Sequence, residues 1–245
     1  MDNILTIKDL SKCYYTLSGE VKAIDNISLE VKEGDFVAIV GASGCGKSTL
    51  LNILDGIDKD YEGNFVLAKG KSIGYMLQRD ALLPWLSIED NCNLGCKIKG
   101  NDNKKEIDRL LKKYELDSFR NKKPSCLSGG MRQRASLIRT LGLNVDLLLL
   151  DEPFSALDYQ TKLKVENDIY KIIKNEGKSA IMVTHDVGSA IAMANKVVVL
   201  SKRPSKVKKI YDIDLGDSDN VMKKRCDERF SYYLDMIWKD LEDDV

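Results

Sequence analysis

The sequence predicts an α/β fold whose mostly parallel sheet is interrupted by an inserted helical segment. Short apolar strand patterns alternate with helical patterns along the chain, as they do in βαβ units. A glycine-rich loop links one of these strands to a helix. Between about residues 79 and 144 the apolar residues take helical spacing on a charged background, so we expect the sheet to resume after an insertion there.

The first third of the chain reads as strands. Residues 4–10 (ILTIKDL) are strand-like, and residues 26–31 (NISLEV) alternate apolar and polar side chains. Phe36–Val40 (FVAIV) is apolar throughout, which is typical of a central strand buried on both faces. Glycines break this strand, and residues 48–54 (STLLNIL) continue as a helix.

The middle and the last third have different patterns. Residues 104–116 (KKEIDRLLKKYEL) carry Ile107, Leu110, Leu111 and Tyr114 at helical spacing, which predicts an amphipathic helix in the insertion. Strand signals return afterwards, with helical patterns between them. The strands are expected at residues 146–153, 179–186 and 196–200, and the helices at 161–175 and 188–195.

The composition argues against a nucleic-acid-binding protein and against a membrane-spanning chain. Thirty-eight basic residues balance 38 acidic ones, so nothing favours nucleic-acid binding. We expect a cytosolic chain, because no leader pattern is present and no apolar run approaches the roughly 20 residues that span a bilayer. The six scattered cysteines indicate thiols in a reducing compartment. Cys92 and Cys96 could form half of a metal site, but two small buried thiols are the better interpretation.

Residues 41–49 (GASGCGKST) follow an apolar strand and open a helix, as a phosphate-binding loop requires. Its glycines let backbone N–H groups approach the β-phosphate, and its lysine supplies a charge near the β- and γ-phosphates. The serine hydroxyl is a ligand for Mg²⁺. The alternative is a tight glycine turn with an exposed lysine. The candidate phosphate-binding residues are Gly41, Ser43, Gly44, Cys45, Gly46, Lys47, Ser48 and Thr49.

Acidic and polar residues follow the other strands. Asp151 comes after four leucines, where we expect it to hold the Mg²⁺ shell, and Glu152 is placed to act as general base on a water. Alone, this pair could be a helix-start acid pair. His185, the only histidine, is either a structural residue or a contact of the γ-phosphate or the attacking water. Gln78 could reach Mg²⁺ through its carbonyl oxygen. Together these residues predict a nucleotide hydrolase.

A second anion-binding helix start is predicted at residues 126–134 (CLSGGMRQR), far from the phosphate loop in the sequence. The chain resembles the ATP-binding cassette (ABC) ATPases in a series of features that follow one another in the sequence. They are the phosphate loop, Gln78, this second stretch, LLLLDEP, SALD and TH. The resemblance implies a P-loop NTPase fold: a RecA-like core, a small antiparallel β subdomain and an inserted helical subdomain. It also implies that two cassettes bind ATP and Mg²⁺ head to tail, each ATP held between one chain's phosphate loop and its partner's Ser128, Gly129 and Gly130.

The same resemblance implies further roles. Tyr14 falls where the family stacks an aromatic on adenine, although Tyr15 is adjacent and Tyr14 could instead pack on the β subdomain. Asp158 in SALD would touch the opposite subunit. The groove near Gln78 and Trp85 would receive a helix of a membrane permease, unless Trp85 is buried in the helical subdomain. The expected boundaries are 1–78 and 145–215 for the core, 79–144 for the helical subdomain and 216–245 for a C-terminal helical tail.

The stretch ALLPWLSIEDN, Met131 and the short tail resemble importer cassettes of the nitrate, sulfonate and taurine group. This implies an ATPase subunit on the cytoplasmic side of the membrane. Its partners would be permease subunits, a second ATPase subunit and, indirectly, a solute-binding protein. The cargo stays open, because this cassette type also serves pyrimidine vitamin precursors. A soluble ABC ATPase acting on DNA or ribosomes, or an exporter cassette, is the alternative.

Overall fold

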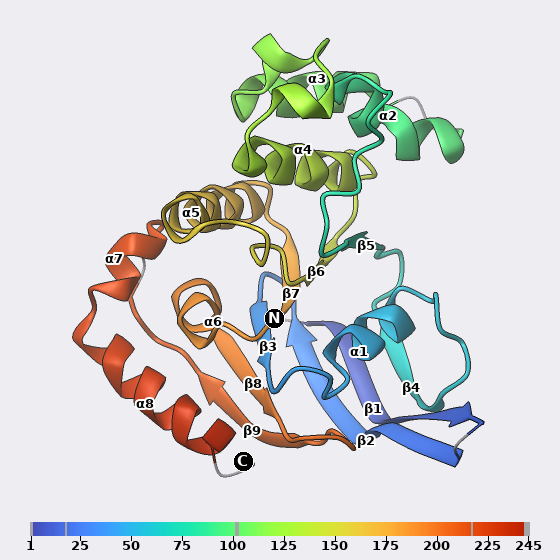
Figure 1. Ribbon diagram of the computed structural model, residues 1–245, viewed down its shortest axis with the longest axis vertical. Coiled ribbons are helices and arrows are strands. Elements are labelled where there is room, and N and C mark those ends of the chain that lie inside the picture. Colours follow the sequence, from blue (N-terminus) through green and yellow to red (C-terminus); the bar gives the residue numbers. More distant parts are fainter. Residues whose placement is uncertain (1, 18, 101–102, 217, 243–245) are drawn as a thin grey trace.

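The computed structural model describes residues 2–17, 19–100, 103–216 and 218–242. Residue 1 of the expected core and residues 217 and 243–245 of the expected tail lie outside the described residues. It confirms the predicted α/β fold (Figure 1). The larger sheet has the order β5-β6-β7-β3-β8-β9 and is parallel except for β9. Its strands are β3 (Phe36–Val40), β5 (Ile73–Met76), β6 (Leu147–Asp151), β7 (Ser179–Thr184), β8 (Lys196–Leu200) and β9 (Val207–Asp212).

The central strands separate two apolar cores. All five residues of β3 are buried, and alternate side chains point to opposite faces. Phe36 and Val40 join the core on the α5 and α6 side, whereas Val37 and Ile39 join the core beneath α1 and the smaller sheet. A strand covered on both faces is apolar at every position, which explains why FVAIV and LLLL lack alternation.

The smaller sheet is antiparallel, with the order β2-β1-β4. Its first two strands are much longer than the sequence predicts, at 14 residues each. Asp9 and Asn26 interrupt the apolar alternation, but they have positive φ and lie at irregularities that let the strands continue. The strands are β1 (Asn3–Thr16), β2 (Gly19–Lys32) and β4 (Glu62–Leu67).

Helices α2, α3 and α4 form a layer of their own, and α4 packs against both α5 and the edge strand β5 (Figure 1). No helix of the described residues has both the length and the apolar character needed to cross a membrane. The helices are α1 (Lys47–Leu54), α2 (Ile88–Ile98), α3 (Lys104–Lys113), α4 (Gly129–Leu141), α5 (Tyr159–Asn175), α6 (Val187–Met193), α7 (Val221–Arg225) and α8 (Glu228–Glu242), with 3₁₀ turns at Asp117–Phe119 and Pro124–Cys126.

The cysteine pair of the helical layer is part of its packing. Cys92 and Cys96 are both buried on α2, and their thiols donate to the carbonyl oxygens of Ala135 and Gly142 beside α4. Within the described residues, no disulfide joins any of the cysteines. These two small side chains therefore let α2 lie close against α4.

A cluster of charged groups ties the helical layer to the end of α5. The carboxylate of Glu176 accepts hydrogen bonds from Arg109 and Lys113 of α3 and from the hydroxyl of Tyr114. Burial acts to raise the pKa of Glu176, but these three donors outweigh it and lower the pKa to about 2. One carboxylate thus joins the helical layer to α5.

Replacing Glu176 with Gln is expected to lower the free energy of unfolding at pH 7 by about 1–3 kcal/mol, because three donors lose an ionised acceptor. The depressed pKa of Glu176 means that the carboxylate stabilises the fold above pH 4.5 and loses this effect as the pH falls toward 2. Urea denaturation at several pH values measures both effects. The exposed Glu115, changed to Gln, is the control, and a gap between wild type and Glu176→Gln that widens in acid would contradict the assignment.

Candidate active site

Four neighbouring parallel strands carry the predicted site residues at their C-terminal ends. The strands are neighbours in the order β5-β6-β7-β3. Strand β5 leads to Gln78, β6 to Asp151 and Glu152, β7 to His185, and β3 to the phosphate loop. Because parallel strands point the same way, all of these ends meet at one edge of the sheet. The fold therefore gathers residues that are more than 100 positions apart in the sequence.

The loop between β3 and α1 has the backbone of a phosphate cradle. Gly44 and Gly46 have φ of 75° and 118°, a region that side chains disfavour. A Cβ on Gly46 would also lie 3.1 Å from the carbonyl oxygen of Ala23 and from Oγ of Ser205. Lys47 folds back over the loop, and its Nζ donates to the carbonyl oxygens of Gly41 (2.8 Å) and Ala42 (3.1 Å). The alternative of an exposed lysine is wrong, because Lys47 is only 7% exposed.

Ser48 and Asp151 place two hard oxygen atoms side by side. The hydroxyl of Ser48 donates to Oδ1 of Asp151 at 3.1 Å, and the hydroxyl of Tyr75 donates to Oδ2, also at 3.1 Å. Burial raises the pKa of Asp151 above its ordinary value, although both hydrogen bonds act in the other direction. A cation beside this buried carboxylate would favour its charged form, so the pair fits Mg²⁺. Tyr75 carries no motif, and sequence reasoning missed it.

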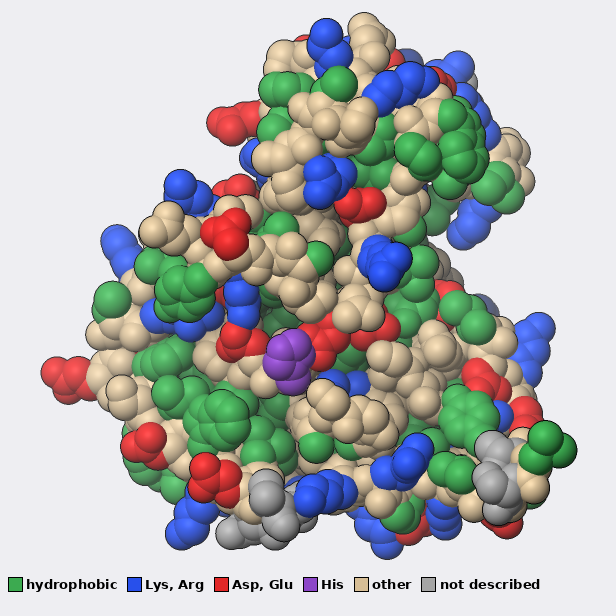
Figure 2. All heavy atoms as spheres, in the orientation of Figure 1, with side chains coloured by type: hydrophobic (Ala, Val, Ile, Leu, Met, Phe, Trp, Pro, Cys, Tyr) green, Lys and Arg blue, Asp and Glu red, His purple; other side chains and the backbone are tan. Residues whose placement is uncertain are grey.

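Glu152 and His185 face each other at the surface. Nδ1 of His185 lies 2.9 Å from Oε1 of Glu152, and an ionised carboxylate only accepts, so Nδ1 carries the proton. Glu152 has φ of 44°, an uncommon conformation for a residue with a side chain. Such conformations cluster at active sites, although this chain also has them outside the site, at Asp9 and Asn26 among others. Figure 2 shows the histidine exposed beside acidic side chains, and its side chain is 61% exposed.

Gln78 lies at the other side of Glu152. Its Nε2 donates to Oγ of Ser155 at 3.4 Å, and that hydroxyl donates to the backbone oxygen of Glu152 at 3.1 Å. Ser155 was not among the predicted site residues. The serine links the glutamine of the domain junction to the backbone of the acidic pair.

A cavity of about 280 Å³ lies over the phosphate loop. Tyr14 lines it, while Tyr15 does not and is 78% exposed. The hydroxyl of Tyr14 contacts Oγ1 of Thr49 at 3.4 Å. Cys45 is buried outside this cavity, and burial raises the pKa of its thiol. The cavity is lined by Tyr14, Ala23, Ser43, Gly44, Gly46, Lys47, Ser48, Thr49, Gln78, Glu152 and Arg203, of which Ala23 and Arg203 were not predicted.

The second anion-binding motif does not line this cavity. Ser128 caps α4, where its hydroxyl accepts from the backbone N–H of Met131 at 3.3 Å. A Cβ on Gly129 would lie 2.8 Å from the side chain of Leu157, which precedes α5, and one on Gly130 would lie 2.5 Å from Val165 of α5, so only Gly130 bears on the approach of α4 to α5. Asp158 caps α5 by accepting from the N–H of Thr161. The chain thus holds two separate candidate half-sites.

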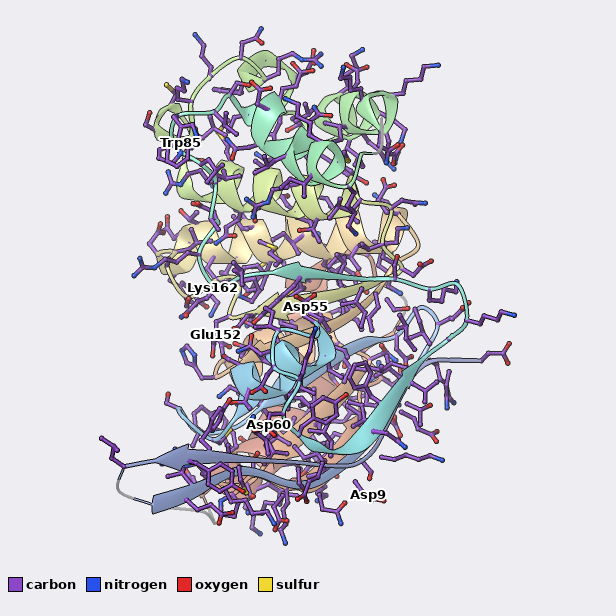
Figure 3. The ribbon with its side chains drawn as sticks, turned by 90° about the vertical axis from the view of Figure 1, so that its right-hand side faces the viewer. Asp9, Asp55, Asp60, Trp85, Glu152 and Lys162 are labelled. Carbon is purple, nitrogen blue, oxygen red and sulfur yellow. The ribbon has the colours of Figure 1, made fainter. Side chains whose placement is uncertain are left out.

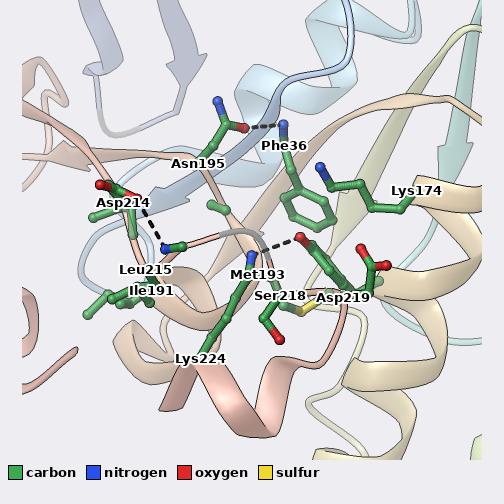
Figure 4. Close-up of a pocket in the computed structure, with 14 residues that line it drawn as sticks. Phe36, Lys174, Ile191, Met193, Asn195, Asp214, Leu215, Ser218, Asp219 and Lys224 are labelled. Carbon is green, nitrogen blue, oxygen red and sulfur yellow. Dashed lines mark hydrogen bonds between the residues drawn. The ribbon is translucent and has the colours of Figure 1, made fainter. Parts of the chain in front are cut away.

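A further cavity, of about 200 Å³, lies away from the phosphate loop beside α5 and α6 (Figure 4). Phe36 and Lys174 lie on one side of it and Asp214 on the other. It contains no predicted site residue. In the described part of the chain, no three His, Cys, Asp or Glu side chains are arranged to hold a metal ion.

Comparison with known proteins gives consistent results. Residues 24–155 match the ABC transporter family. The chain is 40% identical to the ABC transporter ATP-binding protein YtlC of Bacillus subtilis, over 98% of this chain and 96% of the relative. It is 36% identical to the taurine import ATP-binding protein TauB of Roseobacter denitrificans, over 98% and 96%. It is 33% identical to the aliphatic sulfonates import ATP-binding protein SsuB of Bacillus cereus, over 93% and 96%.

Solved structures agree. The dimeric post-hydrolysis structure of the ATP-binding cassette MJ0796, bound to ADP and Pi, matches with a TM-score of 0.73 and 31% identity. The match covers 86% of this chain and 99% of that one. The likeness therefore extends over the whole of that cassette.

Replacing Tyr75 with Phe removes one donor from Asp151 and is expected to raise the pKa of that carboxyl further. The apparent affinity for Mg²⁺ should then fall about 10-fold, as is usual when a partner of a metal ligand is lost. Titration of ATP hydrolysis with Mg²⁺ measures this. Tyr61→Phe is the matched control, because its ring packs on Phe65 in the smaller sheet. Equal Mg²⁺ requirements for the two variants would show that Tyr75 does not support Asp151.

Proposed function

The chain belongs to the ABC transporter family as an ATP-hydrolysing subunit, and we propose that it energises import of a small sulfonated solute such as taurine or an aliphatic sulfonate. The observation that carries the proposal is the likeness, over more than nine-tenths of the chain, to import subunits with those two substrates in their names. The soluble and exporter alternatives are not favoured. Nitrate, the other cargo expected from the sequence, is in neither name.

The cavity over the phosphate loop would hold ATP. Backbone N–H groups of the loop and the start of α1 would bind the β-phosphate, and Lys47 would leave Gly41 and Ala42 for the β- and γ-phosphates. Tyr14 lines the cavity and would stack on adenine, in preference to Tyr15, which does not line it. The exposed Arg203 at the same cavity would add a positive charge.

Mg²⁺, when bound, neutralises charge that develops on the phosphate oxygens. Ser48 and Asp151 would hold it, with Gln78 contributing its carbonyl oxygen from the junction with the helical layer. Tyr75 would keep the carboxylate of Asp151 oriented.

Glu152 would orient the attacking water and accept its proton as general base. His185, whose Nδ1–H binds the carboxylate, would fix the direction of Glu152 and contact the γ-phosphate with its other nitrogen.

The second anion-binding motif would complete the site of a partner subunit. Ser128 and the backbone of Gly129 and Gly130 lie outside this chain's own nucleotide cavity, at the start of a 13-residue helix whose dipole favours an anion. The MJ0796 cassette is dimeric in its structure with ADP and Pi, which supports the pairing of two such chains. Two chains would therefore hold two ATP molecules, each between one chain's phosphate loop and its partner's α4.

The chain would act at the cytoplasmic side of the membrane, bound to permease subunits and served by a solute-binding protein. Trp85 supports this placement, because it is 65% exposed and the alternative of a buried tryptophan is wrong. Figure 3 shows it on the same side of the molecule as Glu152 and Lys162. An exposed tryptophan is a suitable anchor for a short helix of the permease.

Replacing Glu152 with Gln is expected to leave ATP affinity unchanged and to slow hydrolysis by about 100-fold or more, because the base is lost. The variant should also accumulate as a dimer with two trapped nucleotides. Phosphate release and size-exclusion chromatography with Mg-ATP measure the two effects. Glu30→Gln, an exposed change on β2, is the control. Hydrolysis at the parent rate would rule out Glu152 as the base.

Deleting the gene in its own organism is expected to abolish growth on taurine or an aliphatic sulfonate as sole sulfur source, while growth on sulfate continues. The wild-type gene should restore growth, and the Glu152→Gln gene should not. Uptake of labelled taurine provides a direct measurement. Unimpaired growth and uptake on both sulfonates would refute the proposed cargo without touching the ATPase assignment.

A further inference from the structure

A buried carboxylate joins three helices behind the active site. Glu166 of α5 has no solvent exposure, and its Oε2 accepts from Nη2 of Arg225 in α7 at 2.8 Å. Its Oε1 accepts from the hydroxyl of Ser189 in α6. Burial of a charge is costly unless partners compensate for it, so the positions of these partners are strongly coupled.

Further contacts connect Glu166 to the loop that carries His185. Asp186 follows the histidine and caps α6, with its Oδ1 accepting from the backbone N–H of Ser189 at 2.7 Å. Its Oδ2 pairs with Lys162 of α5, whose Nζ is also 3.9 Å from Glu166. Burial acts to raise the pKa of Asp186, but Lys162 and Ser189 outweigh it and hold the pKa below its ordinary value. The residue after His185 is thus tied to the same carboxylate.

Arg225 fits closely against the first turn of α6. A Cβ on Gly188 would lie 3.0 Å from Nη1 of Arg225, so there is little space between the guanidinium and the helix backbone. Nε of Arg225 is buried without a hydrogen-bond partner in the described residues. This is a cost that the fold tolerates, and it is offset by the contact with Glu166. Asn167 of α5 further anchors α7 by accepting from the N–H of Val221.

We infer that Arg225, acting through Glu166 and Ser189, is a positioning residue that fixes the start of α6 and so holds His185 against Glu152. The path runs from α7 to Glu166, to the first turn of α6 and to the histidine loop, whose Nδ1 reaches Glu152 at 2.9 Å. The catalytic consequence rests on the role proposed above for His185. Helix α7, which carries Arg225, would thus support ATP hydrolysis without contacting the substrate.

The only histidine of the chain provides a direct test. In protein made with isotopically labelled histidine and no histidine tag, the imidazole gives a single set of NMR signals, all from His185. Arg225→Gln is expected to shift these signals, because the start of α6 is released. The matched control is Arg229→Gln, which breaks only exposed ion pairs with Asp214 and Asp227. Unchanged signals in Arg225→Gln would overturn the proposal.

Kinetics on the full-length dimer give the second measurement. Arg225→Gln should lower kcat for ATP about 10-fold with little change in KM, as expected when a misplaced side chain acts mainly in the transition state. Arg225→Lys should restore most of the activity, and Arg229→Gln should match wild type. If His185→Ala is slow, a kcat unchanged in soluble, folded Arg225→Gln would overturn the proposal.

Two further variants separate the possible failures. If Arg225→Gln does not fold, Ser189→Ala takes its place, because it removes only the hydroxyl between α6 and Glu166 and should give the same signal shift and loss of kcat. If His185→Ala hydrolyses ATP at the parent rate, the role proposed for His185 fails. In that case the NMR signals of His185 still decide whether Arg225 positions it.

Discussion

The parallel pairing of β5, β6, β7 and β3 is the constraint on which the rest of the structure depends. These strands present their C-terminal ends side by side, so one edge of the sheet receives a cradle of backbone N–H groups, two acidic side chains, a glutamine and a histidine. Both faces of the sheet must be covered to bury the apolar strands, and the two cores do this. The site is thus a consequence of how the sheet is built.

The sequence predicted the fold and the grouping of Lys47, Ser48, Asp151 and Glu152, because motifs with fixed strand and helix contexts carry both. It did not predict Tyr75 or the Arg225–Glu166 pair. Arginine and glutamate are common residue types, and a contact between two residues 59 positions apart leaves no pattern in a single sequence. The full lengths of β1 and β2 were missed for another reason: positive-φ residues at irregularities broke the alternation without ending the strands.

The phosphate loop and the second anion-binding motif differ in why the fold places glycine there. In the phosphate loop, positive φ and contact with Ala23 and Ser205 require glycine at position 46. In the second motif, Gly129 and Gly130 do not have positive φ, and an added Cβ would meet side-chain atoms of Leu157 and Val165, which would have to shift. A substitution at Gly129 or Gly130 would therefore disturb the packing of α4, in addition to any effect on the half-site proposed above.

Helix α5 has 17 residues and is about 25 Å long. Val165 touches the second anion-binding motif, Glu166 holds the C-terminal segment, and Glu176, just past its end, binds the helical layer. A continuous helix curves only gently, and a sharp kink between these contacts would interrupt its backbone hydrogen bonds. These contacts therefore lie along one continuous helix, so a displacement of the helical layer that moved α5 would also shift its contacts with Gly130 and Arg225.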